Sequence, residues 1–293
     1  MYRELTMIDI PWAEEMLGRI NSSARVLFHT AFSNGNLVKA LVYECKENKG
    51  IVSVIKGDDY YSVQISFQED LHSYDVIKSV EQEVRQIILT RGSYEVYLNV
   101  NGYNVILLNS LTNLGFMQDA LGFEFVLHKQ EDTLKRYESI QLDKEITMKT
   151  FEDRHSEKYL RLLDNAFRQQ NIECGQEQDM YLNEYSTYQI KKMKASADDN
   201  CFYTFWIKDD LIGLCFFKNN YLDTIAVDPI FEGKGYGSKM MEACIYDRLF
   251  VKNDTNIYLH TYIQNRRAQR LYLKHGFEVQ GFYSENTYLE TQF

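Results

Sequence analysis

One short segment near the end of the chain has glycine at every second position. The segment reads Asp-Pro-Ile-Phe-Glu-Gly-Lys-Gly-Tyr-Gly-Ser, with its glycines at Gly233, Gly235 and Gly237. Because glycine has no side chain, the main-chain N–H groups there can turn inward and approach an anion closely. We expect a helix to begin at Ser238 and to run to about residue 250, which adds unpaired N–H groups and a positive dipole end. The main-chain amides of residues 233–238 are therefore predicted to form a pyrophosphate cradle.

Two other phosphate-binding loops do not fit this segment. A dinucleotide-binding loop needs an acidic residue about 20 residues further on. The next predicted strand, residues 256–262, ends without a suitably placed carboxylate. A P-loop needs Gly-Lys-Ser/Thr where the loop enters its helix, but Lys234 lies inside the loop and no such triplet follows.

The segments around the loop carry a more specific pattern. Val-x-Pro at 227–229 precedes it, and Asn-x-x-Ala-x-x-x-Tyr-x-x-x-Gly-Phe follows at 265–277. In this order and spacing, the sequence resembles the GNAT superfamily of acyl-CoA N-acyltransferases. The resemblance covers residues 221–282 and extends more weakly back to about residue 144. One departure is Glu232, where the family usually has Arg or Gln. A carboxylate beside a pyrophosphate is repulsive, so we expect Glu232 to lower the affinity for CoA.

The resemblance implies acetyl-CoA as the cosubstrate, and it implies roles for particular residues. The pantetheine arm would lie beside the strand that ends at the Val-x-Pro break. Main-chain groups of Ile225, Ala226 and Val227 would bond that arm and the thioester carbonyl. The cradle would consist of Gly233, Lys234, Gly235, Tyr236, Gly237 and Ser238.

Two side chains of the later motif would complete the site. Asn265 would bond the cofactor, although it could equally be a helix cap. Tyr272 would act as the general acid that protonates the leaving thiolate, unless it is one of the many core tyrosines. No motif identifies the general base. Asp223 is our candidate, Glu173 and Glu177 are others, and a water relay is equally open.

Composition narrows the classes of partner. The net charge is −10, which argues against nucleic acid or an anionic membrane as a partner and suits a cationic small acceptor better. No apolar stretch reaches the roughly 18 residues that a membrane-spanning helix needs, and no signal peptide is visible at the start of the sequence. The five cysteines are scattered and form no Cys-x-x-Cys or Cys/His cluster. We therefore expect no metal site and a reducing cytoplasmic location.

The chain reads as two related halves. Shifting the second half back until Asn265 falls on Asn104 also places Gly276-Phe277 on Gly115-Phe116, and the strand at 256–262 on the apolar residues around 96–98. The same shift places the three loop glycines on His72, Tyr74 and Val76. We predict a degenerate GNAT-like domain without a CoA site at 1–130, a linker at 131–143, and a catalytic acetyltransferase domain at 144–293.

The predicted fold class is α+β or mixed α/β, with two GNAT-like domains that each have a central mixed sheet flanked by helices. In the first half we expect a helix at 11–20, strands at 24–32, 37–45, 50–56 and 60–67, a helix at 77–90 and a strand at 94–100. In the second half we expect helices at 155–169 and 179–196, three strands between 201 and 227, and, after the glycine loop, a helix at 265–275 and a strand at 278–289.

These observations favour an N-acetyltransferase that moves an acetyl group from acetyl-CoA to a primary amine of a small molecule. The alternative is a CoA-binding regulatory or interaction module without turnover. A tandem enzyme that uses aminoacyl-tRNA is a third reading, against which the acidic balance of both halves counts. A homodimer is left open.

Overall fold

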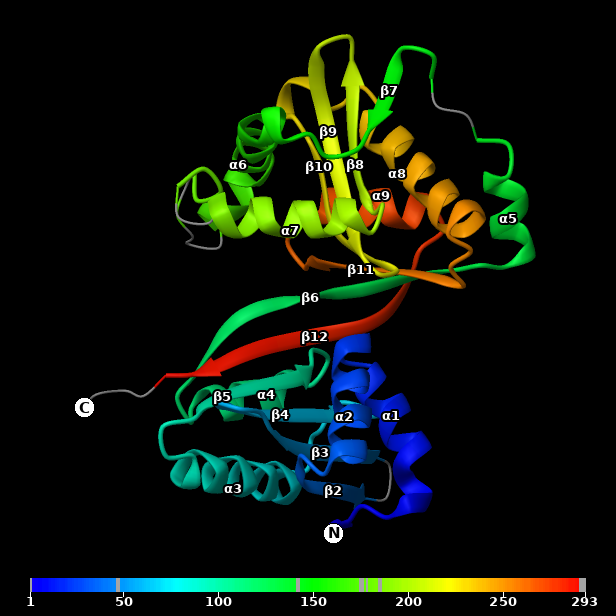
Figure 1. Cartoon of the computed structure of the whole chain (residues 1–293). Helices are drawn as coiled ribbons and strands as arrows, with labels where there is room; N and C mark the ends of the chain where they lie inside the picture. Colours follow the sequence, from blue (N-terminus) through cyan, green and yellow to red (C-terminus); the bar gives the residue numbers. More distant parts are fainter. Residues whose placement is uncertain are drawn as a thin grey trace. The chain divides into compact units, whose positions relative to one another are not determined.

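The computed structural model describes residues 2–45, 48–140, 143–173, 177, 179–183 and 186–289. The chain forms two compact units (Figure 1). The first unit consists of Met1–Glu124, Thr261–Gln264 and Val279–Phe293. The second consists of Phe125–His260 and Asn265–Glu278.

The first unit is a sheet with helices on both faces. Its strands follow the order β1-β2-β3-β4-β5-β12-β6, in which β4 and β5 are parallel and β1 to β4 are antiparallel. The elements are β1 (Tyr2–Glu4), η1 (Met7–Asp9), α1 (Ile10–Gly18), α2 (Ser22–Asn34), β2 (Leu37–Cys45), β3 (Asn48–Lys56), β4 (Tyr60–Phe67), α3 (Tyr74–Thr90), β5 (Glu95–Asn101), α4 (Val105–Thr112), β6 (Phe116–His128) and β12 (Glu278–Tyr288).

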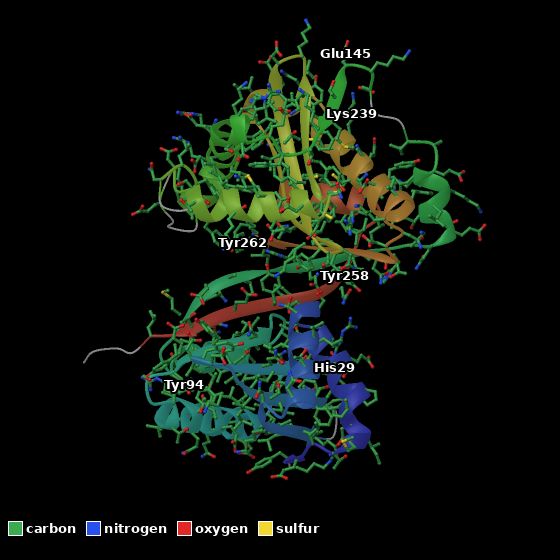
Figure 2. The ribbon with its side chains drawn as sticks, in the orientation of Figure 1. His29, Tyr94, Glu145, Lys239, Tyr258 and Tyr262 are labelled. Carbon is green, nitrogen blue, oxygen red and sulfur yellow. The ribbon has the colours of Figure 1, made fainter. Side chains whose placement is uncertain are left out.

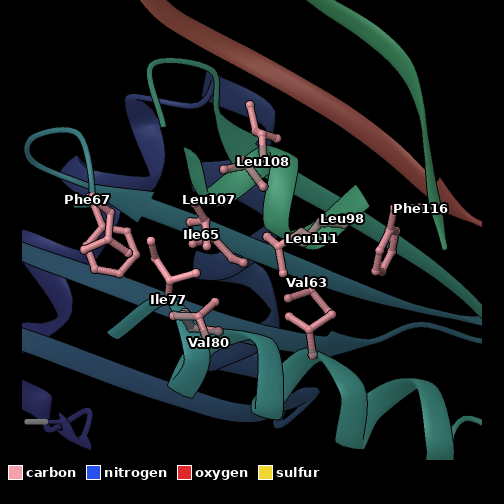
Figure 3. Close-up of a cluster of buried hydrophobic side chains, with 14 of the residues drawn as sticks. Val63, Ile65, Phe67, Ile77, Val80, Leu98, Leu107, Leu108, Leu111 and Phe116 are labelled. Carbon is pink, nitrogen blue, oxygen red and sulfur yellow. The ribbon is translucent and has the colours of Figure 1, made fainter. Parts of the chain in front are cut away.

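Alternating residues of the strands contribute to two hydrophobic cores in this unit, one on each face of the sheet. Val52 and Val54 pack with residues of α3 and α4, whereas Ile51 and Ile55 face α1 and α2. Figure 3 shows the first of these cores, with Val63 and Ile65 of β4 opposite the two helices. The period of two along the strands therefore decides which helix pair each side chain meets.

The strand predicted at 24–32 is wrong, because these residues belong to α2. Asn21 caps this helix by accepting a hydrogen bond from the Ala24 N–H at 2.7 Å. Gly35 ends it in the left-handed conformation, with φ of 76°. The buried residues Ala24, Phe28 and Ala31 recur at helical spacing. Caps and period outweigh the weak β propensity of this segment.

The second unit has the same plan. Strand order runs β11-β10-β9-β8-β7, with β10 and β11 parallel and the others antiparallel. The elements are α5 (Glu131–Tyr137), β7 (Ile146–Lys149), η2 (Asp153–His155), α6 (Ser156–Glu173), α7 (Ser186–Asp198), β8 (Phe202–Ile207), β9 (Asp210–Lys218), β10 (Tyr221–Val227), η3 (Pro229–Phe231), α8 (Tyr236–Tyr246), η4 (Asp247–Val251), β11 (Asn256–Tyr262) and α9 (Arg266–Lys274).

Helices cover both faces of this second sheet. Leu214, Phe216 and Ala226 pack against α6 and α7. On the opposite face α8 approaches closely, since a Cβ at Gly213 would lie 2.5 Å from the sulfur of Met240. The mixed α/β fold class is thus confirmed, with a parallel strand pair in each otherwise antiparallel sheet.

The internal repeat is confirmed at the level of elements. β4, β5 and α4 begin at Tyr60, Glu95 and Val105, and the shift predicted from the sequence carries them onto the first residues of β10, β11 and α9. Asn104 and Asn265 both precede the helix, and Gly115 and Gly276 both have positive φ. The two halves therefore have the same order and spacing of elements, although the loop at 233–237 has three glycines and the corresponding loop at 72–76 has none.

The compact units do not follow the predicted domain boundaries. Residues 131–137, expected in a linker, form α5 within the second unit, and residues 141–142 lie outside the described part of the chain. β6 passes from the first unit into the second at Phe125. Residues 279–293 belong to the first unit, where β12 pairs with β5. Each half thus contributes strand residues to the other half's unit.

None of the helices in the described ranges is both long and apolar enough to cross a membrane.

Candidate active site

Two parallel strands of the second unit part shortly after they meet. β10 and β11 pair only at Tyr221–Tyr258 and Leu222–Leu259. Immediately beyond, a β-bulge between Leu222 and Thr224 makes Asp223 an extra residue against β9. Bulges bend a strand and increase its twist. The bulge therefore accounts for β10 leaving β11, so that the two strands are not paired beyond Leu222–Leu259 and the sheet opens between them. Tyr258 of β11, in the first of the two pairs, is labelled in Figure 2.

Main-chain groups of β10 face this opening. The Asp228 N–H donates to the Ile212 carbonyl of β9 at 3.0 Å. Hydrogen-bonding direction alternates along a strand, so Ala226 also faces β9, while Ile225 and Val227 face the opening. Of the three residues predicted to bond the pantetheine arm, these two can therefore do so through their main chain, and Ala226 is held by β9.

The glycine loop follows the opened strand. Gly233 and Gly235 have φ of 73° and 84°, a region that glycine adopts at little cost. The N–H groups of residues 233–237 donate to no acceptor within the described part of the chain, whereas the N–H groups of Ser238 and Lys239 donate to the Gly235 carbonyl. A Cβ at Gly233 or Gly235 would meet no protein atom within 4 Å, so the space next to these two Cα atoms is free of protein. The loop thus fits a diphosphate.

The helix after the loop begins earlier than predicted. Gly235 is the N-cap of α8, which starts at Tyr236 rather than at Ser238 and ends at Tyr246, where η4 continues the chain. The left-handed Gly235 lets the helix start two residues sooner. As a consequence the predicted contribution of the Ser238 N–H to the cradle is already used within the helix.

Glu232 is neutralised by a partner that the motif does not show. Its carboxylate forms an ion pair with Arg267, in the first turn of α9. The repulsion expected between Glu232 and a diphosphate is therefore reduced by a guanidinium beside it.

Buried His275 forms a hydrogen bond with Ser238, directly after the glycine loop. The Tyr137 hydroxyl donates to the His275 carbonyl at 2.8 Å and lies 3.0 Å from His275 Nδ1. Nδ1 then carries the proton, which leaves Nε2 to accept from the Ser238 hydroxyl at 2.7 Å. Burial, with the charges of Arg136 and Lys274, lowers the pKa of His275 to about 4, so the ring stays neutral. Lys274 Nζ donates to the Ser238 oxygen at 3.0 Å.

Tyr272 has a buried ring and an uncommitted hydroxyl. The ring packs edge-on against Phe125 at 5.6 Å and near Phe277 at 6.0 Å. Its hydroxyl makes no hydrogen bond within the described residues, and burial raises the pKa of the phenol far above its ordinary value. The group stays protonated at neutral pH, as a proton donor must.

Asn265 caps α9, which is one of the two roles predicted for it. Its side-chain oxygen accepts from the Ala268 N–H at 3.0 Å, and its Nδ2 donates to Gln170 of α6 at 3.3 Å. A contact between Asn265 and the cofactor remains a prediction.

The candidate bases differ in their surroundings. Asp223 forms an ion pair with Lys192 of α7 at 2.8 Å and accepts from the Thr224 hydroxyl at 3.0 Å. Glu173 and Glu177 are exposed, and Glu173 accepts from Gln169 on its own helix. Asp223 therefore lies at the point where the strands part, whereas nothing in the described contacts ties the two glutamates to it.

His260 is a functional candidate that the motif did not single out. Asp223 and His260 are the residues next after the last strand pair, Leu222–Leu259. His260 Nδ1 lies 3.0 Å from the Tyr221 hydroxyl. His260 is exposed, but neighbouring protein partly desolvates the ring and lowers its pKa, while the charge of Asp223 acts in the opposite direction. Its place in the sequence, alternating with buried Ile257 and Leu259, was the available signal.

The first unit lacks this arrangement. β4 and β5 stay paired over six positions, from Tyr60–Glu95 to Ile65–Val100. No register shift interrupts the ladder between β3 and β4. Gln64, which corresponds to Ile225, is thus paired with Asn99 within the sheet.

Comparison with known proteins gives the same reading for the second half. Residues 157–277 match the model of the Acetyltransferase (GNAT) family. A protein of Bacillus subtilis named spermine/spermidine N(1)-acetyltransferase is 27% identical over 121 residues, which cover 35% of this chain and 80% of that protein.

Solved structures resemble the chain over nearly its whole length. A GCN5-related N-acetyltransferase from Sphaerobacter thermophilus has a TM-score of 0.52 at 14% identity, and the match covers 98% of this chain and 94% of that one. A Drosophila protein has a TM-score of 0.51 at 14% identity, with coverage of 100% and 99%. These likenesses concern the fold.

Proposed function

Because residues 157–277 match the GNAT acetyltransferase family, we propose that the chain transfers an acetyl group from acetyl-CoA to a primary amine of a small molecule. The observation that carries this proposal is that β10 and β11 are no longer paired after Leu222–Leu259, and that β10 then leads into a loop whose N–H groups at residues 233–237 have no acceptor in the described part of the chain. Acetyl-CoA, when bound, supplies the activated acetyl group.

The residues around the opening divide the chemistry among them. The main-chain groups of Ile225 and Val227 would hold the arm and polarise the thioester carbonyl. His260 would take the proton that the attacking amine must lose, since its lowered pKa favours the neutral ring at neutral pH. Tyr272 would donate its phenolic proton to the departing thiolate. Amides 233–237 would hold the diphosphate, with Lys274 beside them.

The acceptor that we propose is a cationic amine. The net charge of −10 favours attraction of such molecules. The name of the B. subtilis relative directs the first choice of test compounds to spermine and spermidine.

The test is thiol release from acetyl-CoA in the presence of these polyamines and a panel of other small amines, with the acetylated product identified by mass spectrometry. Calorimetric titration with CoA should give one site per chain, because the described residues of the first unit have neither the parted strands nor the glycine loop. Thiol release that no amine stimulates, in a protein that binds CoA, would support the alternative of a binding module without turnover. Two CoA sites per chain would contradict the degenerate reading of the first half.

A further inference from the structure

The first unit contains a cleft at the place that corresponds to the proposed CoA site of the second unit. The cleft has a volume of about 1030 Å³. Its walls come from the loop after β4, the turn between β5 and α4, and the start of β12, all within the first unit. The size is that of a site for a small molecule.

This cleft cannot hold CoA in the way proposed for the second unit. The pairing of β4 with β5 continues to Ile65–Val100, so the strands do not part to admit a pantetheine arm. His72, Tyr74 and Val76 occupy the positions that correspond to the three glycines of the cradle. The cleft has therefore kept its place in the fold while losing both features that recognise the cofactor.

Asn104 in the wall of the cleft holds an unsatisfied hydrogen-bond acceptor. Asn104 and Asn265 have similar backbone angles, φ of −85° and −78° with ψ of 62° in both. Asn265 caps its helix through the side-chain oxygen, but Asn104 makes no such bond. Its Nδ2 donates to the Asn101 carbonyl at 3.3 Å, and its Oδ1 is buried without a partner in the described chain. Asn104 is only 1% exposed, and an unpaired buried acceptor is costly.

The rim of the cleft carries carboxylates. Glu69 and Asp70 are exposed and form no ion pair within the described residues. Arg19 also lines the cleft, with a guanidinium N–H that donates to the Gln68 carbonyl at 3.0 Å. The three charged groups sum to −1, the sign that repels a diphosphate and attracts a cation.

Aromatic rings also line the cleft, from Tyr103 and Phe282. Tyr103 packs edge-on against Phe282 with ring centroids 4.7 Å apart, and Phe123 stacks on Phe282, also at 4.7 Å. A Cβ at Gly102 would approach Phe282 to 2.9 Å, so glycine there makes room for the ring. Aromatic faces attract organic cations.

We infer that the cleft of the first unit is a second binding site, which takes a small organic cation whose N–H groups reach Asn104 Oδ1 and whose charge is met by Glu69 and Asp70. A protonated primary or secondary amine has both properties. The cation occupies the place of the cofactor, and the site is independent of turnover in the second unit.

The experiment is calorimetric titration of the full chain with spermidine and, separately, with tyramine. The double variant Glu69→Gln/Asp70→Asn removes the rim charges, and Asn104→Leu removes the acceptor while keeping the side-chain volume. Asp58→Asn/Asp59→Asn is the matched control, because it makes the same change in charge on the exposed turn between β3 and β4. A melting curve for each variant verifies that it is folded.

We expect wild type and control to bind at least one of the two amines equally, and each cleft variant to bind it about fivefold to tenfold more weakly. CoA binding should be the same in all four proteins, since the proposed CoA site lies elsewhere. If both cleft variants bind both amines as the wild type does, the inference is wrong. Loss of CoA binding in the cleft variants would show that the cleft is a cofactor site instead.

Discussion

Reduced contact with water shifts the pKa values of two side chains of the proposed site in opposite directions. It raises the pKa of the buried Tyr272 phenol and lowers the pKa of the His260 imidazole, which its neighbours partly desolvate although the residue is exposed, because in both cases the charged form is the less well solvated one. The acid therefore keeps its proton at neutral pH and the base stays free of one. Paired groups whose pKa values are separated in this way are suited to donate and accept protons in one reaction.

The sharpest expectation at this scale concerns Tyr272→Phe. The variant keeps the ring contacts with Phe125 and Phe277 but removes the proton, so kcat should fall about 100-fold or more. KM for acetyl-CoA should change little. The free energy of unfolding should change by less than about 1 kcal/mol, because the hydroxyl has no hydrogen bond to lose in the described chain. Steady-state kinetics and a denaturant melt measure both.

Tyr94→Phe, which makes the same chemical change in the first unit, is the control for Tyr272→Phe. Wild-type kcat in Tyr272→Phe would remove this residue from the mechanism. A large loss of stability with a parallel loss of activity would make it a core residue only.

The pH profile tests His260. Since its pKa lies below the ordinary value of about 6.5, the rate should be constant above that pH and should fall as the pH decreases through the folded-state pKa, where the imidazole becomes protonated. His260→Gln should lower kcat about 100-fold at pH 7.5 and remove this acidic limb.

Asp223→Asn separates the two candidate bases. If His260 is the base, this variant keeps the acidic limb of the wild-type profile, though it loses the ion pair with Lys192. If Asp223→Asn removes the limb and His260→Gln retains it, Asp223 is the base.

At the scale of elements, the bulge and the loop act together. The bulge at Asp223 turns β10 away from β11, and the loop that follows, with positive φ at Gly233 and Gly235, leaves the N–H groups of residues 233–237 without an acceptor in the described part of the chain. In the first unit both devices are absent from the corresponding residues, and the strands remain paired. The bulge against β9 and the two glycines with positive φ therefore distinguish the strand pair that parts in the second unit from the strand pair that stays closed in the first.

Gly235→Val tests the loop. The β-branched side chain resists the φ of 84° and projects into the space before the amides. We expect CoA to bind at least tenfold more weakly, which corresponds to about 1.4 kcal/mol. Calorimetric titration measures the affinity.

Gly92→Val is a matched control for the strain. Gly92 has φ of 62° and, like Gly235, nothing within 4 Å of an added Cβ, but it lies in the first unit. This variant should lose stability comparably and bind CoA as the wild type does. Unchanged affinity in a folded Gly235→Val protein would show that the loop does not hold the phosphates.

At the scale of the molecule, local patterns in the sequence predicted the elements well and their partners poorly. The glycine loop, Asn265, Tyr272 and the internal repeat are visible because each depends on residues close together in the chain or on one constant shift. The pairing of β12 with β5 joins segments far apart in the sequence, such as those of Asn286 and Leu98. No periodicity within either segment contains that information. The alternation with Ile257 and Leu259 could have placed His260 on the other face of its strand, but only strand register places it next to Asp223.

Part of β6 belongs to the second unit and almost all of β12 belongs to the first, so the two possible domain boundaries can be tested with fragments of the chain. A fragment of residues 144–293 follows the predicted domain, but it lacks Phe125, which packs on Tyr272, and Tyr137, which is 1% exposed and bonds His275. It also retains β12 without its partner β5. We expect this fragment to have no cooperative melting transition and no affinity for CoA.

A fragment of residues 125–278 contains the whole second unit and is the comparison for this test. It omits β12 almost entirely and so leaves no long unpaired strand, which would promote aggregation. It should melt cooperatively and bind CoA. Circular dichroism melts and calorimetry on both fragments decide the matter. If residues 144–293 fold and bind CoA while 125–278 does not, the boundary read from the sequence is the correct one, and Phe125 and Tyr137 are dispensable to the site.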